Sequence, residues 1–251
     1  MSQSSFEGAA GSQTRPFLTA VWRYLAMLNY EVDPAVLRSH VPEGTVVDTW
    51  RGKAFVSMVG FLFLDTRVLG AAIPFHRNFE EVNLRFYVRQ AGREDAPRAV
   101  AFVKEIVPRP AIAWTARLLY GEKYVHLPMQ HQLEYRAGIP SLVEYRWRTR
   151  GRWQRLGVKP LGAAQPITPG SEEEFIAEHY WGYASRGSGT VEYAVEHPPW
   201  RVWQVGESWL ECDVAELYGP EFAPFLRVPP SSAFLAEGSA VVVRQGRRLS
   251  A

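Results

Sequence analysis

The feature that most restricts the fold of this chain is a repeated alternation of apolar and polar residues with a period of two. In "EEVNLRFYVRQ" (80–90), the apolar residues from Val82 to Val88 take the even positions, and the more polar ones take the odd positions. This spacing is typical of β-strands, whose successive side chains point to opposite faces. Similar strand-like segments occur at 53–69, 98–107, 190–197, 208–217 and 239–246, and 142–156 is predicted to be a hairpin turning near Gly151.

Helix signals are few and short. Asp33 and Pro34 predict an N-cap and a first helical position, and "PAIAWTARLLYG" (110–121) predicts a helix that ends at Gly121. Ser171 with Glu174 three residues later forms a capping-box pattern at the start of "SEEEFIAEHYWGY". A weak turn is expected after Pro220. The chain is therefore predicted to be mainly β, with a few short helices.

The number and length of the strands favour a closed architecture. Long antiparallel strands with little helical cover leave exposed edges unless the sheet curls into a barrel. We therefore predict antiparallel strands curled into a cone-like barrel around an internal cavity. Residues 1–14 are predicted to be a disordered tail, and 15–251 a single domain, because strands of similar character flank the linker-like segment 159–170.

Charge and composition point to a chain that is not directed to nucleic acid or membranes. The net charge is +2, no window approaches the roughly 20 apolar residues that span a bilayer, and the N-terminus lacks a signal-peptide pattern. The single cysteine, Cys212, excludes an intrachain disulfide framework and is predicted to be a buried structural thiol. We expect a cytoplasmic protein with no cofactor, and the sequence leaves open whether it forms a homo-oligomer.

The polar face of segment 80–90 is the first candidate site. Its side chains either form the solvent-exposed outside of a strand or line the interior of a barrel. In the second case Asn83 and Arg85 would bind a carboxylate or a carbonyl, because the planar guanidinium pairs bidentately with carboxylates.

A second candidate is "FVKEIV" (102–107), in which adjacent residues carry opposite charges. Regular alternation places Lys104 with Val100 and Phe102, and Glu105 on the opposite face. A buried unpaired charge is costly, so one of the two should be paired, located at an edge or functional.

Histidines and common catalytic motifs give little support for other chemistries. His179 in "EHYWGY" and His197 in "VEHPPW" do not have the helical or HxH spacing of a metal site, so no metal is predicted. The chain also lacks GxSxG, GxxxxGK[ST], GxGxxG and HExxH motifs.

Several separate motifs together resemble a known family. "LAMLNYEVDPAVLRSHVPEGTVVDTWRGKAFVSMVGFLF", "FEEVNLRFYVR", "ARLLYGEKYVH" and "VEHPPW" resemble the YqjF-like family of uncharacterised bacterial proteins, domain of unknown function 2071. This family is more distantly similar to acetoacetate decarboxylase. That resemblance implies an antiparallel barrel around a cavity, in which the decarboxylase carries a Schiff-base lysine activated by a neighbouring cation.

The lysine of the decarboxylase does not transfer in register. When "PAIAWTARLL" is matched from Arg117, the decarboxylase's proline falls on Lys123 and its Schiff-base lysine on Tyr124. A shift of one residue reverses the face to which a strand side chain points. The resemblance therefore moves attention from Lys123 to Tyr124, and Arg23 matches an arginine of the decarboxylase's first strand.

These observations predict a protein that binds a small organic carbonyl or carboxylate without a Schiff-base lysine. Two alternatives stay open: an enzyme (a lyase, hydratase or isomerase acting on a small keto acid) that uses Tyr, His and Arg, and a non-catalytic structural or interaction protein. The candidate ligand-binding residues are Arg23, Asn83, Arg85, Tyr120 and Tyr124, and the candidate catalytic residues are Tyr124, His126 and Lys104.

Overall fold

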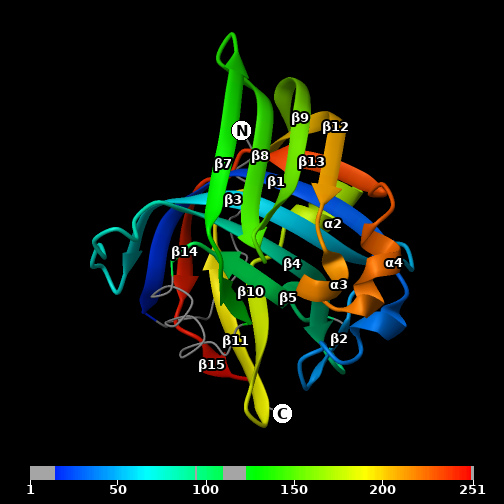
Figure 1. Ribbon diagram of the computed structural model, residues 1–251. Coiled ribbons are helices and arrows are strands. Elements are labelled where there is room, and N and C mark those ends of the chain that lie inside the picture. Colours follow the sequence, from blue (N-terminus) through cyan, green and yellow to red (C-terminus); the bar gives the residue numbers. More distant parts are fainter. Residues whose placement is uncertain (1–14, 94, 110–122, 250–251) are drawn as a thin grey trace, which may run out of the picture.

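The centre of the computed structural model, which describes residues 15–93, 95–109 and 123–249, is a closed barrel of seven strands (Figure 1). In order around the ring these are β1 (Pro16–Val32), β3 (Ala54–Val68), β4 (Phe79–Gln90), β5 (Ala99–Val107), β10 (Trp181–Arg186), β11 (Gly189–Glu196) and β14 (Ala240–Arg244). Pairing of β14 with β1 closes the ring, and only the β5–β10 contact within it is parallel. The predicted barrel is confirmed.

Strand β1 belongs to two parts of the structure because it is 17 residues long. Its first half pairs with β14, and its second half, from Leu25 to Asn29, pairs with β13 (Ser232–Ala236). The sheet then continues away from the barrel through β12 (Arg201–Glu211), β9 (Arg152–Pro166), β8 (Ile139–Thr149) and β7 (Met129–Arg136). We call these five strands the outer sheet; β7, β8 and β9 stand above the barrel in Figure 1.

The barrel wall has buried side chains on both of its faces. On the outer face, Leu84 and Met58 pack with Tyr145 and Trp147 of β8, all of them fully buried. The inner face carries a second cluster that includes Phe61 of β3. The barrel interior is therefore isolated from the outer sheet by a layer of backbone.

Gly60 permits the close contact between the barrel and the outer sheet. A Cβ atom at this position would lie 2.5 Å from Cδ2 of Tyr145 and 2.7 Å from Cδ2 of Leu156. A bulge lies opposite Gly60 on the facing strand, where the register of β1 shifts between Arg23 and Ala26. Tyr145 donates a hydrogen bond of 2.8 Å to the carbonyl oxygen of Tyr24 in this bulge.

The remaining elements are short. They are the strands β2 (Thr45–Val47), β6 (Tyr124–His126) and β15 (Arg247–Arg248), and the helices η1 (Pro34–Leu37), α2 (Glu172–Ala177), α3 (Val214–Leu217), η2 (Pro220–Phe222) and α4 (Ala223–Leu226). Asp33 and Ser171 accept the predicted N-cap hydrogen bonds of η1 and α2. The predicted strand 208–217 is wrong in its second half, because Asp213 caps a helix there. The predicted helix 110–121 and the predicted tail 1–14 both lie outside the described residues.

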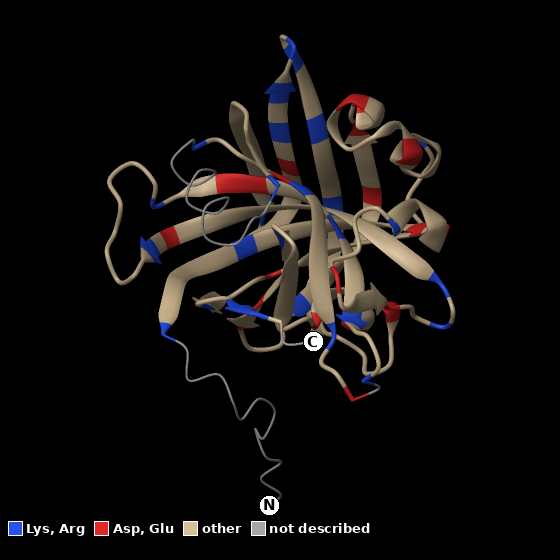
Figure 2. Ribbon diagram, turned by 90° about the horizontal axis from the view of Figure 1, so that it is seen from below, with Lys and Arg blue, Asp and Glu red and all other residues tan. Residues whose placement is uncertain are grey.

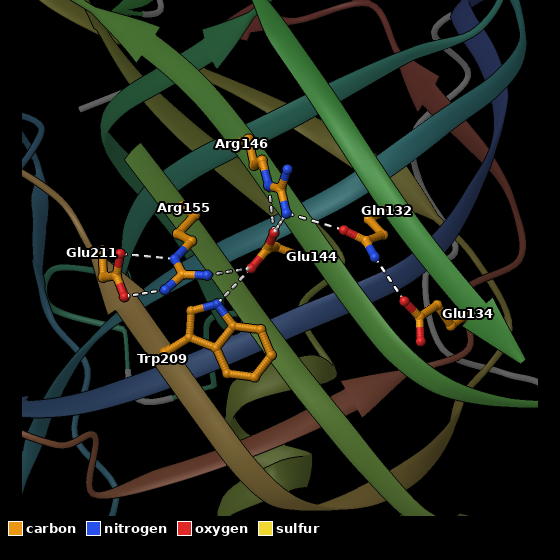
Figure 3. A network of polar contacts seen from close by, with 7 residues as sticks. All are labelled: Gln132, Glu134, Glu144, Arg146, Arg155, Trp209 and Glu211. Carbon is orange, nitrogen blue, oxygen red and sulfur yellow. Dashed lines mark hydrogen bonds and ion pairs between the residues drawn. The ribbon is translucent and has the colours of Figure 1, made fainter. Parts of the chain in front are cut away.

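A polar network joins four strands of the outer sheet, β7, β8, β9 and β12 (Figure 3). Glu144 of β8 is only 2% exposed, and Arg146 and Arg155 both form ion pairs with it. Trp209 of β12 donates a hydrogen bond of 2.9 Å to the same carboxylate. Arg155 of β9 pairs with both Glu144 and Glu211 of the neighbouring strands, and Arg146 donates to Gln132 of β7, so we interpret the network as a structural cross-link.

Charged residues of both signs are distributed over the strands and loops (Figure 2). This distribution agrees with the balanced charge of the sequence, which is +2. Within the described ranges, none of the helices has the length and hydrophobicity needed to cross a membrane.

Candidate functional site

A cavity of about 150 Å³ lies inside the barrel. Its polar lining comes mainly from β4, β5, β6 and the segments after α2 and β11, and its apolar lining comes mainly from β1, β3, β11 and β14. The polar side chains that matter for the following description are Glu81, Asn83, Arg85, Glu105, Tyr124, His179 and His197. The candidate site is therefore enclosed by the strands that close the barrel.

Strand β4 supplies the polar core of the site. Glu81, Asn83 and Arg85 point into the cavity, and their neighbours Val82 and Leu84 pack on the opposite face against the outer sheet. Asn83 and Arg85 are 3% and 8% exposed. Of the two alternatives for this polar face, the structure shows the inward one.

Glu81 is a buried carboxyl group with two hydrogen-bond donors beside it. Asn83 Nδ2 donates to Oε1 at 2.9 Å, and the hydroxyl of Tyr124 lies 3.3 Å from Oε2. Burial raises the pKa of Glu81, and the two hydrogen bonds and the charge of Arg85 lower it, leaving a pKa of about 7. Near neutral pH this group can therefore both accept and donate a proton.

Arg85 and Asn83 have hydrogen-bonding capacity that the protein does not use. Arg85 donates through Nη2 to the carbonyl oxygen of Ile176 at 2.8 Å. Within the described part of the chain, its buried Nε makes no hydrogen bond, and neither does Oδ1 of Asn83. One unused donor and one unused acceptor thus belong to two residues that line the same cavity.

A bulge in β5 determines which of the two charged side chains, Lys104 or Glu105, faces the cavity. Arg85 pairs with Phe102 but Leu84 pairs with Lys104, so Val103 is an extra residue in β5. Phe102 and Glu105 consequently both line the cavity, whereas Lys104 lies on the opposite face. Regular alternation, which predicted Lys104 on the same face as Phe102, is therefore wrong here.

Lys104 contacts the helical segment that covers the outer face of the barrel. Its Nζ donates to the carbonyl oxygen of Leu217, and the ammonium lies 6.0 Å from the ring centroid of Tyr218. Burial, assisted by the charge of Lys123, lowers the pKa of Lys104. This candidate catalytic residue is thus separated from the cavity by the barrel wall.

Tyr124 faces the cavity, as the shift in register from the decarboxylase suggested. It begins β6, which pairs in parallel with β5 and places Tyr124 beside Glu105. His126 shares its parity but lies at the exposed end of this three-residue strand, with Nε2 3.1 Å from the carbonyl oxygen of Pro108. The structure therefore does not bring His126 to the cavity lining.

The other sequence candidates are placed as follows. Lys123 is exposed, and its Nζ lies 3.4 Å from Nδ1 of His40. Arg23 forms an ion pair of 3.5 Å with Glu237 and is not among the residues that line the cavity. Tyr120 lies outside the described residues.

Two histidines contribute to the site in a way that the sequence did not reveal. His179 is 6% exposed and its ring lies 4.8 Å from that of Tyr87, and neither ring nitrogen makes a hydrogen bond within the described residues. Burial and the charges of Arg85 and Arg98 lower the pKa of His179 well below its ordinary value, so the ring is neutral. His197 stacks on Trp200 at 4.1 Å between centroids, and burial lowers its pKa as well.

The sequence offers these histidines only as metal ligands, and their spacing does not indicate a metal site. In the described part of the chain, no three His, Cys, Asp or Glu side chains are grouped as a metal site would require. His179 follows the short helix α2, and His197 follows β11, which is itself a strand of the barrel. No local sequence pattern indicates that either side chain faces the cavity.

The barrel with its internal cavity defines a protein of the acetoacetate decarboxylase-like fold. The acetoacetate decarboxylase of Legionella pneumophila is similar, with a TM-score of 0.65 and 11% identity, over 98% of this chain and 93% of that chain. The enduracididine biosynthesis enzyme MppR, complexed with the condensation product of pyruvate and imidazole 4-carboxaldehyde, is similar with a TM-score of 0.67 and 13% identity, over 95% of this chain and 90% of that chain. At these identities the likeness shows the fold alone.

The family is shown by sequence. The chain belongs to DUF2071, a family described as an uncharacterized conserved protein, whose profile matches residues 19–240. The uncharacterized protein YqjF of Bacillus subtilis (strain 168) is 26% identical over 210 residues, which are 82% of this chain and 84% of the relative. The resemblance inferred from the sequence motifs is confirmed.

Proposed function

We propose that this protein binds a small organic carboxylate with a carbonyl group in the barrel cavity, and that Arg85 binds its carboxylate. The observation that carries the proposal is the unused hydrogen-bonding capacity of Arg85, Asn83 and His179 around one cavity. A buried polar group without a partner costs about 1–3 kcal/mol, so a ligand that pairs with these groups gains affinity.

The chemistry of the three groups supports this class of ligand. Arg85 offers an N–H and a permanent positive charge, which suit a carboxylate. The neutral His179 offers a donor and an acceptor, and Oδ1 of Asn83 accepts from a hydroxyl group or a bound water. The structural neighbour MppR is complexed with a product formed from pyruvate, which is a carboxylate next to a carbonyl.

The lysines of this chain argue against an imine intermediate in the cavity. The four lysines, all of which lie in the described residues, are Lys53, Lys104, Lys123 and Lys159, and none of them lines the cavity. Lys53 and Lys159 form exposed ion pairs with Glu31 and Glu207. We therefore propose that the ligand is bound without a covalent link to the protein.

The raised pKa of Glu81 favours an enzyme over a protein that only binds its ligand. A carboxyl group with a pKa of about 7 is matched to proton transfer at neutral pH. In our proposal the Glu81 carboxylate removes a proton from the carbon next to the ligand's carbonyl, and the C–H electron pair becomes the enolate double bond. Tyr124 donates a hydrogen bond to the enolate oxygen, and the proton returns from Glu81 to carbon, as a lyase, hydratase or isomerase requires.

Binding of 2-oxobutanoate at pH 6, measured by calorimetry, tests the ligand class. Arg85→Met should weaken binding at least about ten-fold, because a charge-assisted hydrogen bond contributes about 1.5–3 kcal/mol. Arg23→Met is the matched control, since Arg23 pairs with Glu237 away from the cavity, and it should leave affinity unchanged. Equal affinities for the wild type and Arg85→Met, with circular dichroism showing both folded, would refute the role of Arg85.

Proton exchange tests the enzymatic step separately. In D₂O, the wild type should replace the C3 hydrogens of 2-oxobutanoate by deuterium faster than buffer does, which proton NMR measures directly. Glu81→Gln should bind the keto acid but lose this exchange. Binding without enhanced exchange in the wild type would leave a binding protein and overturn the proton-transfer proposal.

A further inference from the structure

We infer that the natural ligand is amphipathic: a keto acid whose carbonyl carries, through a carbon that bears hydrogen, a compact branched-aliphatic or aromatic group, rather than a short polar keto acid such as pyruvate or acetoacetate. This inference rests on the proposed function, and it specifies the part of the ligand that Arg85 does not contact. It follows from how the cavity changes in polarity along its length.

The pairing of β3 with β4 gives the direction of this change. Glu81 pairs with Phe61, and two residues earlier in β4 Phe79 pairs with Phe63. All four side chains line the cavity, whereas Asn83 and Arg85 extend it in the opposite direction along β4. Glu81 therefore marks the boundary between a polar end and an aromatic end.

The aromatic end is a preformed apolar surface. Trp22 makes edge contacts with Phe61 and Phe63, at 5.2 Å and 5.6 Å between centroids, and Phe63 stacks on Phe79 at 4.7 Å. Rings packed in this way present mainly carbon to the cavity, so water bound beside them would find few hydrogen-bond partners. Val243 of β14 lines the cavity and packs in the same group of side chains as Trp22.

Two further buried atoms refine the description of this end. Nε1 of Trp22 and Oγ1 of Thr66 make no hydrogen bond within the described residues, and both side chains line the cavity. A single polar atom at the far end of the ligand would satisfy the indole N–H.

The size of the cavity limits the apolar group. The cavity here measures about 150 Å³. An engineered cavity of about the same volume in another protein binds one benzene molecule. The ligand therefore has about six to twelve non-hydrogen atoms, which excludes long acyl chains but admits a branched five- or six-carbon keto acid or a phenyl keto acid. With Arg85 at the carboxylate and the rings at the apolar group, the carbon next to the carbonyl lies near Glu81.

A series of keto acids of increasing size tests the inference by calorimetry: pyruvate, 2-oxobutanoate, 4-methyl-2-oxopentanoate and phenylpyruvate. Each added methylene should raise affinity about four-fold when it is buried. The three extra carbons of 4-methyl-2-oxopentanoate should thus give about a 60-fold gain over pyruvate. The ketone 4-methyl-2-pentanone, which lacks the carboxylate, should bind more weakly than the matching keto acid.

A variant with a larger side chain at the aromatic end of the cavity tests the inference a second way. Val243→Phe should abolish most of the gain from added carbons, measured as the ratio of the affinities for 4-methyl-2-oxopentanoate and pyruvate within the same variant. Val242→Phe, on the same strand but absent from the cavity lining, is the control and should keep the gain.

The outcomes separate this inference from the proposal on which it rests. If pyruvate binds with the expected dependence on Arg85 but affinity does not rise along the series, the amphipathic ligand is refuted and the carboxylate site stands. If affinity rises equally in the wild type and in Val243→Phe, the aromatic end is not where the apolar group binds. If no keto acid binds the wild type, both proposals fail.

Discussion

Replacement of Glu81 by glutamine should change how the stability of this protein depends on pH. Glu81 is 2% exposed, and its pKa is raised to about 7 from an ordinary value of 4.5. Between these two values the folded protein keeps a proton that the unfolded chain releases. The contribution of Glu81 to the free energy of unfolding of the wild type must therefore fall as pH rises from about 4.5 to about 7.

The size of this effect follows from the two pKa values. One pKa unit corresponds to about 1.4 kcal/mol, so the rise from 4.5 to about 7 destabilises the folded protein at high pH by about 3 kcal/mol. Glutamine is nearly the same size and cannot ionise. Relative to wild type, Glu81→Gln should therefore gain about 2–3 kcal/mol between pH 5 and pH 8.

Urea unfolding followed by tryptophan fluorescence, at one-unit steps from pH 5 to pH 8, measures this difference. Tyr124→Phe should move the midpoint of the wild-type profile to higher pH, because the hydrogen bond from Tyr124 lowers the pKa of Glu81. Subtracting the wild-type profile from that of a variant removes the contributions that both proteins share. One of these comes from His179, whose lowered pKa makes the folded protein less stable as pH falls below the ordinary pKa of histidine.

Glu80→Gln is the matched control, since Glu80 precedes Glu81 in β4. Burial raises the pKa of Glu80, but the hydrogen bond of 2.7 Å with His131 and nearby positive charges outweigh it and lower the pKa overall. Glu80 therefore stabilises the folded protein at pH values above its unfolded pKa, and Glu80→Gln should lose stability there. A difference between wild type and Glu81→Gln that stays constant within about 0.5 kcal/mol from pH 5 to pH 8 would refute the raised pKa.

Three further outcomes are expected. Gly60→Ala should lower the free energy of unfolding by about 1–3 kcal/mol through overpacking, whereas Gly189→Ala, with no atom within 4 Å of a new Cβ, should change it little in the same urea titration. Borohydride reduction with pyruvate should add no mass to the intact protein, and an adduct mapped to Lys104 or Lys123 would contradict the placement of these lysines. Burial and neighbouring carboxylates raise the pKa of Cys212 to about 12, so a disulfide reagent at pH 8 should label the native thiol at least about 100-fold more slowly than the unfolded one.

The parts of the fold that the sequence predicted are those where the strands are regular. Strand β4 pairs with β3 without a shift from Phe79 to Phe86, so its alternation gave the correct sides for Asn83 and Arg85. That the polar side faces a cavity depends on closure of the ring by β1 and β14. These strands lie more than 200 residues apart, and no local pattern reports such a pairing.

The predictions failed where the register shifts. The bulge in β5 reversed the expected sides of Lys104 and Glu105, and the bulge opposite Gly60 left no simple period in β1. The helix α3 carried a signal that could have been used, because Asp213 is a good N-cap residue in a segment that otherwise alternates. His179 could not be placed from sequence, since its environment comes from residues on other strands.

The bulge at Val103 has a consequence for how relatives of this chain should be compared. Column by column, an alignment equates side chains by their order along the chain, but here one extra residue decides whether an amine or a carboxylate enters the barrel. Two homologues with identical residues at 104 and 105 would differ in their chemistry if only one of them had the bulge. Conversely, an insertion or deletion at this point can preserve the lining while every downstream column appears displaced. Assignments of activity within this family should therefore compare strand pairing around β5 before residue identity.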